Sequence, residues 1–180
     1  MGKSATRISE AQEKFIRAQS IFFVASAPLD AKGNINVSPK GLDSFRILGP
    51  TTVGYLDLTG SGVETIAHVR ENGRIVVMFC AFQGAPKILR LHGQGRVVEP
   101  PSAEFDGLAA LFPTYLSTRS IIVVEVARVS DSCGYGVPLM KFDGERSQLH
   151  DWARKKGPEG LAAYREEKNR RSIDGLAGLE

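Results

Sequence analysis

One long hairpin in the middle of the chain constrains the fold more than any other feature of the sequence. Its first strand, Arg74–Phe82, is almost continuously apolar, which is typical of a strand buried on both faces or of a barrel strand. A Gln-Gly-Ala-Pro turn at 83–86 sends the chain back into a second long strand, Ile88–Glu99. Because Gly93 and Gly95 lie inside this second strand, we expect a bend there or the close approach of another backbone. The sequence thus predicts a curved antiparallel hairpin.

Four further segments are rich in β-branched and aromatic residues and are bounded by turn residues, so we expect four more strands. Six strands in mostly adjacent hairpins, with helices after the third and the fifth, predict a mainly β (α+β) fold built on a small antiparallel barrel. The segment Arg46–Pro50 is expected to be irregular. The four strands are predicted at Ile21–Ala27, Asn36–Lys40, Thr51–Leu58 and Ser120–Val129.

Helices are predicted around this barrel and after it. Ser9 and Gln12 have capping-box spacing before the first helix, and Ser61 and Glu64 repeat that spacing before the second, which Gly73 is expected to end. The whole chain, 1–180, is expected to form one domain, with a core at about 21–130 and a helical tail at about 145–171. The helices are predicted at Ile8–Gln19, Val63–Asn72, Ser102–Leu111, Glu145–Lys156 and Pro158–Arg170.

Composition and charge exclude several classes of partner. With 42% hydrophobic residues, a chain of 180 residues can bury one sizeable core. The 23 Lys and Arg residues against 20 Asp and Glu leave a formal charge of only +3, so no nucleic acid or membrane partner is expected and any basic site must be local. Cys80 and Cys133 follow no metal-ligand spacing. No apolar run approaches ~20 residues and no signal peptide is recognisable, so we expect a cytoplasmic protein.

The common catalytic motifs do not occur in the sequence. No G-x-G-x-x-G opens a helix after a strand, because Gly93-Gln-Gly95 lies within a strand and has no third glycine at the required offset. A P-loop, a G-x-S-x-G elbow and an H-E-x-x-H helix are also missing. The sequence therefore excludes the usual dinucleotide-binding, nucleotide-hydrolysing and hydrolase patterns.

The end of the second predicted strand carries the most informative polar pattern. Alternation places Asn36 and Ser38 on one face, and Pro39, which has no N–H to donate, is expected at an edge where pairing stops. Lys40 follows at the strand terminus, where a cation can meet an anion. About twenty residues later, the helix start at 61–65 offers backbone N–H groups and the positive end of a helix dipole. Together the two elements predict a phosphate pocket; taken singly, a solvated lysine and an ordinary helix cap are the alternatives.

The order of these segments resembles a known family. Asn36-Val-Ser-Pro-Lys-Gly41, Tyr55-Leu-Asp57, a Gly/Ser turn into a short helix, Val76-Val-Met-Phe79 and Leu89-Arg-Leu-His-Gly93 follow one another as in the pyridoxamine 5′-phosphate oxidase-like FMN-binding split barrels. The resemblance covers about 21–129 and is one of order and spacing. Cys133-Gly-Tyr-Gly-Val-Pro138 and the helical tail look like an uncharacterised bacterial branch of that family.

The resemblance implies a six-stranded antiparallel split barrel that forms a homodimer, with FMN in each of two clefts between the subunits. It also implies a set of residues that line the flavin and its phosphate, with Arg90 on a strand near the interface. A deazaflavin in place of FMN stays open. The implied cofactor-binding residues are Val37, Ser38, Pro39, Lys40, Tyr55, Leu56, Asp57, Ser61, Thr65 and Arg90.

Two departures from the family pattern affect these expectations. Many relatives carry basic residues in the turn before the helix, whereas this chain has Thr-Gly-Ser-Gly at 59–62, which leaves Lys40 as the one cation expected at the phosphate. Family members that are true oxidases carry an Arg-Leu-His-Asp-Arg run; Gln148-Leu-His-Asp-Trp152 echoes it without either arginine. We therefore do not expect synthesis of pyridoxal phosphate.

Two classes of function remain on the sequence alone. The first is an FMN-dependent oxidoreductase acting on a small molecule, with His92 as a candidate proton donor, although a histidine hydrogen-bonded within the barrel is the alternative. The second is a non-catalytic split-barrel module that binds flavin or haem for storage, sensing or partner regulation, with His92 or His68 as the haem ligand. Cys133, Tyr135 and Trp152 are expected to have packing roles; a reactive thiol at Cys133 and a ring covered by Tyr135 or Trp152 are the alternatives.

Overall fold

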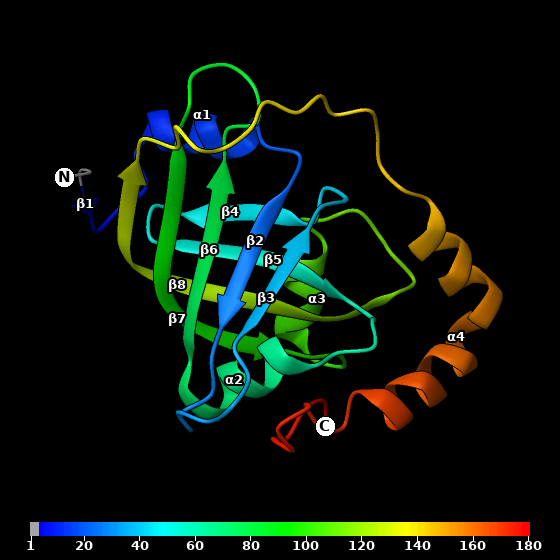
Figure 1. Cartoon of the computed structure of the whole chain (residues 1–180). Helices are drawn as coiled ribbons and strands as arrows, with labels where there is room; N and C mark the ends of the chain where they lie inside the picture. The colour runs from blue at the N-terminus through cyan, green and yellow to red at the C-terminus, as the bar shows by residue number, and fades with distance from the viewer. Residues whose placement is uncertain (1–3) are drawn as a thin grey trace.

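A single curled antiparallel sheet forms the body of the molecule in the computed structural model, which describes residues 4–180 (Figure 1). Its strand order is β3-β2-β6-β7-β8-β5-β4, and the short β1 pairs with β8. The curl leaves β3 and β4 as edges and confirms the predicted split-barrel fold. The strands are β1 Ser4–Ala5, β2 Phe22–Ser26, β3 Asn36–Lys40, β4 Phe45–Gly49, β5 Thr52–Leu58, β6 Arg74–Cys80, β7 Ile88–Val98 and β8 Thr118–Ser132.

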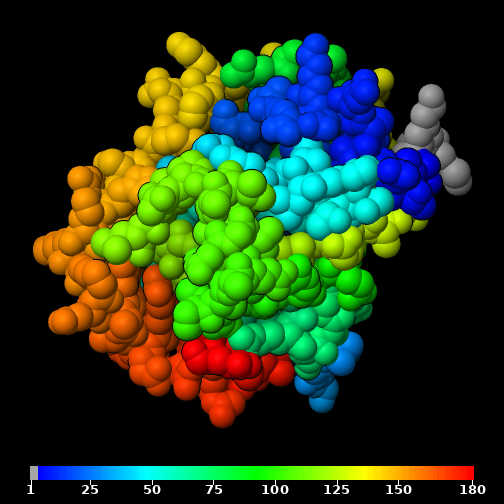
Figure 2. Space-filling model, turned by 180° about the vertical axis from the view of Figure 1, so that it is seen from behind, coloured from blue at the N-terminus to red at the C-terminus, as the bar shows by residue number. Residues whose placement is uncertain are grey.

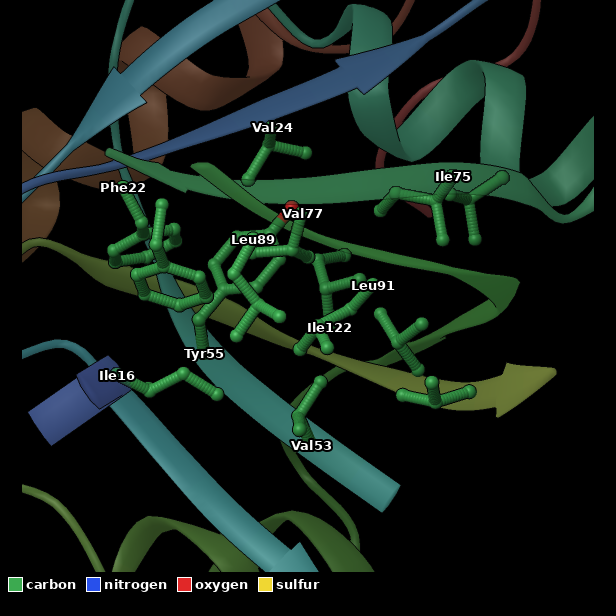
Figure 3. Packing of buried hydrophobic residues seen from close by; sticks show 14 of the residues in the cluster. Ile16, Phe22, Val24, Val53, Tyr55, Ile75, Val77, Leu89, Leu91 and Ile122 are labelled. Atoms are coloured by element: carbon green, nitrogen blue, oxygen red, sulfur yellow. The ribbon is translucent and has the colours of Figure 1, made fainter. Parts of the chain in front are cut away.

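Apolar side chains on the inner face of the sheet fill the main core. Figure 3 shows side chains of β2, β5, β6, β7 and β8 converging there, and the ring of Tyr55 lies among them. Val24, Val77 and Leu91 sit opposite one another on neighbouring strands and are completely buried. A second, smaller core lies on the other face of β5, where Leu56 packs with Phe112. Strands β5 and β8, which contribute to both cores, are thus buried on both faces over part of their length, whereas β6 alternates between buried and half-buried residues, as suits the alternative expectation of a barrel strand.

Among the described residues, four helices surround the sheet. Helix α1 begins at the capping box that Ser9 and Gln12 were predicted to form, and α2 ends, as predicted, at Gly73 in the left-handed conformation. Figure 2 shows the α3 region (green) lying over the body on the side opposite to the view of Figure 1. Over residues 4–180, none of the helices combines the length and the apolar character that crossing a membrane requires. The helices are α1 Glu10–Arg17, α2 Glu64–Asn72, α3 Ala103–Ala109 and α4 Gln148–Lys168.

Three details differ from the sequence-based expectations. The segment predicted to be irregular contains a strand, β4, so that with β1 the sheet has two strands more than the expected six. Pro39 does not end the pairing of β3, because the register continues to Lys40 opposite Phe22; an edge strand tolerates the missing N–H. The first of the two tail helices begins at Gln148 rather than at Glu145, whereas the predicted break between them is confirmed, because α4 is interrupted at Gly157, where φ is 66°.

The bend predicted in the long hairpin lies at Gly93. The register between β7 and β8 shifts between His92 and Gly93, which marks a bulge. A Cβ atom at Gly93 would lie 2.1 Å from the carbonyl oxygen of Glu125, so the neighbouring backbone comes too close for any side chain. The glycine is therefore required by close approach of β8.

We expect Gly93→Ala to lower the free energy of unfolding by about 1–3 kcal/mol or more, because the added methyl group must displace backbone rather than a flexible side chain. Gly107→Ala is the matched control. Gly107 lies within α3 with open space around it, and there alanine should raise stability by about 0.5–1 kcal/mol. Urea unfolding followed by circular dichroism measures both changes, and equal stability of the two variants would contradict the close-approach argument.

Candidate functional site

Strand β3 lies beside the start of α2 and the end of β5, so the elements that were expected to share a site are neighbours. Its residues alternate between half-buried Asn36, Ser38 and Lys40 and exposed Val37 and Pro39. The Asn36 amide donates to the Thr65 hydroxyl of α2 at 3.0 Å. Lys40 Nζ lies 3.0 Å from Asp57 Oδ1 at the end of β5. Polar side chains of the edge strand β3 therefore reach α2 and β5 across the opening that the curled sheet leaves, which we call the split.

Asp57 is the centre of this polar group. The carboxylate is 1% exposed and also accepts a hydrogen bond from Arg119 Nε at 2.7 Å, so each of its oxygens contacts one cation. Burial alone would raise the pKa of the Asp57 carboxyl, but the charges and hydrogen bonds of Lys40 and Arg119 hold that pKa below its ordinary value. Asp57 is ionised at neutral pH and fixes the position of both cations.

A third cation lies at the turn where the sequence contains no basic residue. Arg165 of α4 donates from Nε to the Thr59 hydroxyl at 2.8 Å and from Nη2 to the Thr118 carbonyl at 3.0 Å. Burial and the positive charge of Arg119 lower the pKa of the Arg165 guanidinium. Within residues 4–180, no carboxylate lies within ion-pair distance of it. We call Lys40, Asp57, Arg119 and Arg165 the split cluster; three cations and one carboxylate give it an excess of positive charge.

The start of α2 differs from the expected phosphate cradle. The helix begins at Glu64 with Val63 as its N-cap and no side-chain cap, so the predicted capping box of Ser61 and Glu64 is wrong. Glu64 Oε1 instead accepts a hydrogen bond from the backbone N–H of Ile173 in the C-terminal tail, at 3.3 Å. The carboxylate thus lies near the positive end of its own helix, and it opposes an anion at that position.

The C-terminal tail covers this region in its own chain. The Asn169 amide, at the end of α4, donates to the Gly60 carbonyl at 2.9 Å. Asp174 accepts from the backbone N–H and the side chain of Asn34, in the turn between β2 and β3, at 2.8 and 2.6 Å. Ser61 is exposed beside these contacts. The tail therefore holds the 59–62 turn and the β2–β3 turn together.

Tyr55 and Leu56 were expected to line the flavin, but their side chains belong to the two cores. Tyr55 is completely buried in the main core, with Lys40 Nζ 5.8 Å from the centre of its ring. Leu56 points to the opposite face of β5 and packs in the second core. Burial together with the Asp57 charge raises the pKa of the Tyr55 hydroxyl well above 10. Neither side chain is open to solvent.

Arg90 and His92 lie on the outer face of the sheet, separated from β3 by β2 and β6. Arg90 donates to the Ser132 hydroxyl at 3.0 Å. His92 is half-buried, 3.5 Å from the Ser130 hydroxyl, and burial with the charges of Arg128 and Arg90 lowers its pKa. Within one chain the structure does not bring either residue to Lys40.

The outer face continues from Arg90 and His92 to the edge strand. Register places Pro39, Phe23, Met78 and Arg90 in one row across β3, β2, β6 and β7. A parallel row contains Val37, Ala25, Val76 and His92. Figure 1 shows no described element in front of these strands, and Val37 is 61% exposed. We call these two rows the outer face; most of their side chains are apolar.

Sequence reasoning missed three residues of the site. Asn36 was assigned to the correct face of β3 but not to a contact with Thr65. Arg119 stands just before the most β-branched segment, and only the pairing of β5 with β8, which places Asp57 opposite Ser120, brings its side chain to Asp57. Arg165 comes from the distant tail. Each contact depends on strand order or helix placement, which no local pattern encodes.

The curled sheet, which carries a lysine on its edge strand beside the start of a helix, places this protein in the class of split barrels. Comparisons with known proteins identify its family. The family model described as pyridoxamine 5′-phosphate oxidase matches residues 8–133. The pyridoxamine 5′-phosphate oxidase family protein ustO of Aspergillus flavus is 42% identical over 178 residues, covering 89% of this chain and 71% of ustO. The chain belongs to the pyridoxamine 5′-phosphate oxidase family.

Solved structures share the fold at low sequence identity. HupZ of Group A Streptococcus superposes with a TM-score of 0.54 at 22% identity, covering 68% of this chain and 91% of HupZ. A FAD-binding protein of Mesorhizobium loti gives a TM-score of 0.50 at 15% identity, with coverage of 73% and 96%. A Clostridium acetobutylicum protein of the pyridoxinephosphate oxidase family gives 0.51 at 11% identity, with coverage of 77% and 94%. These likenesses establish the architecture.

Proposed function

We propose that the protein is a homodimeric FMN-dependent oxidoreductase that acts on a small molecule. Membership of the family supports a flavin, and the FAD-binding relative of the same fold is consistent with one. The observation that carries the proposal is the split cluster. Its Arg165 guanidinium is half-buried with only neutral partners, and a desolvated cation of this kind favours a bound anion.

The residues present fit a flavin phosphate at the split cluster better than at the start of α2. Lys40 and Arg165 offer donors to phosphate oxygens, whereas Glu64 repels an anion at the helix start. Arg119 is committed to Asp57 and serves to hold the cluster in place. Arg165 of α4 thus supplies the positive charge that basic residues of the 59–62 turn supply in many relatives.

The half-buried face of β3 can contact the part of the flavin that lies beyond its phosphate. Asn36 and Ser38 present an amide and a hydroxyl beside Lys40, in a strand whose outer edge has no β partner among the described strands. A bound flavin supplies hydride and single-electron transfer. The chain's own residues bind and orient it, and the buried Tyr55 and Val24 exclude water from beneath the strand.

The outer face is proposed as the dimer interface. Its apolar side chains resemble the uncovered half of a core, which is typical of a surface that binds a second copy. Two-fold symmetry would place the same face of each subunit against the other, with Arg90 and His92 of both subunits at the contact. His92, with a pKa below its ordinary value, is neutral at pH 7 and is the candidate for proton transfer.

Replacement of the two proposed phosphate ligands tests the cofactor site. We expect Lys40→Ala and Arg165→Gln each to weaken FMN binding by ~1–3 kcal/mol, roughly 5- to 150-fold, because each removes a charge-assisted contact. Riboflavin, which lacks the phosphate, should bind Arg165→Gln as well as it binds the wild type. Fluorescence titration of flavin-free protein measures both affinities.

Arg154→Gln is the control, because Arg154 lies on α4 and is mostly exposed, paired with Asp151. FMN binding unchanged in both test variants would show that the phosphate is held elsewhere. Reduction of bound FMN by a nicotinamide donor, followed by reoxidation by an acceptor, would support the oxidoreductase over a storage or sensing module. A Soret band that is lost in His92→Ala would instead support haem binding, and a deazaflavin can be titrated in the same way.

A further inference from the structure

A cavity of about 180 Å³ lies at the end of β3, outside the split cluster. It is partly open to solvent and is bordered by the last turn of α1, the start of β2, the connection from β3 to β4, and β4 itself. Its apolar wall includes the rings of Phe22, Phe45 and Phe79, whose centres are 5.1–5.9 Å apart. The rings meet at tilted and edge-to-face angles, and Phe45, the half-buried ring of the three, can contact an additional ring.

Polar groups line the rest of this cavity without adding net charge. Arg46 also lines it, and its guanidinium is paired with Asp43 at 2.7 Å. Arg17 is paired with Glu13 at 2.8 Å in the same way. Ser20 adds a hydroxyl group. Because both guanidinium groups already have carboxylate partners, the cavity offers hydrogen bonds but favours an uncharged ligand.

The backbone that frames the cavity is strained. Leu42 and Asp43 have φ angles of 62° and 48°, a left-handed conformation that residues other than glycine rarely adopt. The Tyr115 hydroxyl donates to the Leu42 carbonyl, and Arg46 donates to the carbonyls of Asp43 and Leu111, so distant segments hold this conformation. Strain maintained in this way is concentrated at ligand sites.

The cavity adjoins the proposed flavin site. Gly41, which lines it, directly follows Lys40, and Phe22 of its wall faces Lys40 in the register of β2 and β3. We infer that the cavity binds a single uncharged aromatic ring with hydrogen-bonding substituents, such as a phenol. A sealed apolar cavity of roughly 150 Å³ can hold benzene, so the volume of this partly open and partly polar pocket is sufficient for one ring with a polar substituent. The inference that such rings are the substrates of the protein rests on the proposed function. The inference that the cavity binds them does not depend on it.

Titration of the flavin-free protein with phenol, followed by the amide NMR signals of the full chain, tests the binding site. We expect saturable binding with shifts centred on Gly41, Ser44 and Phe45, and at least about 10-fold weaker binding of benzoate, which is charged, and of cyclohexanol, which has no aromatic face. Ile47→Phe, which fills the cavity from β4, should weaken phenol binding by a similar factor. Shifts elsewhere, or no saturation, would overturn the inference.

Leu48→Phe is the matched control, since Leu48 is the next residue of β4 and packs toward the second core. It should bind phenol like the wild type, and equal loss in both variants would count against the cavity. The wild-type shift map decides the question even where a variant fails to fold. If FMN does not bind but phenol does, the proposed function fails while the ring site stands; the converse result removes the ring site alone.

Discussion

Replacement of Asp57 by asparagine is expected to lower the free energy of unfolding by about 3–5 kcal/mol. The two side chains have nearly the same shape, so packing changes little, but Lys40 and Arg119 both lose their shared counter-ion. Arg119 is almost completely buried, and an uncompensated buried guanidinium is far more costly than an exposed one. Urea unfolding at pH 7, followed by circular dichroism, measures the loss.

Glu104→Gln is the control for this experiment, because Glu104 forms an ion pair with Arg96 in which both side chains are more than half exposed. We expect it to change stability by less than about 1 kcal/mol. Comparable losses in the two variants would show that burial does not strengthen the Asp57 contacts.

The pH dependence gives a second readout for Asp57. Its pKa in the folded protein lies below the ordinary value of 3.8, so the folded state favours the ionised carboxylate. The resulting stabilisation is present above pH ~4–5 and is lost as the pH falls through 3.8 toward the folded pKa. The wild type should therefore lose stability more steeply than Asp57→Asn below about pH 5. Parallel acid profiles would contradict a lowered pKa.

Val37→Asp is expected to convert the proposed dimer into a monomer at micromolar concentration. Val37 is exposed on the outer face, so an aspartate is tolerated in the isolated chain, whereas the symmetric interface would bury two such carboxylates. We expect the dimer dissociation constant to rise by about 100-fold or more, equivalent to about 2.7 kcal/mol. Sedimentation velocity of wild type and variant measures the change.

Leu111→Asp is the matched control for the interface. Leu111 is a similarly exposed apolar residue, but it follows α3 on the opposite side of the molecule (Figure 2). This variant should remain dimeric. Dissociation by Val37→Asp should also weaken FMN binding, whereas Lys40→Ala should remain a dimer. A wild-type monomer, or a Val37→Asp dimer, would refute the proposed interface.

Local patterns predicted most of the architecture. The strands of the central hairpin, the edge strand and the capping box of α1 follow from alternation, turn residues and side-chain spacing. Strand β4 was missed because its residues, Phe-Arg-Ile-Leu-Gly, are all half-buried between solvent and the core and do not alternate. Thus the fold class and the edge strand β3 could be predicted from local patterns, whereas the other edge strand, β4, could not.

The site was predictable only in part. Lys40 and Thr65 were assigned to one region, and the structure places β3 beside α2 as expected. The spacing of Ser61 and Glu64 suggested a cap, but the tail offers Glu64 the N–H of Ile173, and this contact between distant segments competes with the local one. The same limit applies to Arg119 and Arg165, whose neighbours are set by tertiary packing.

Strand β3 has two different faces within five residues: Asn36, Ser38 and Lys40 turn toward the split, while Val37 and Pro39 belong to the outer face. In the proposed dimer, one face of this strand contacts the flavin and the other contacts the second subunit. The two equilibria are then linked, so FMN would tighten the dimer by the same factor by which dimer formation tightens FMN binding. Cofactor supply would thereby set the fraction of assembled protein at low concentration, without any separate regulatory site.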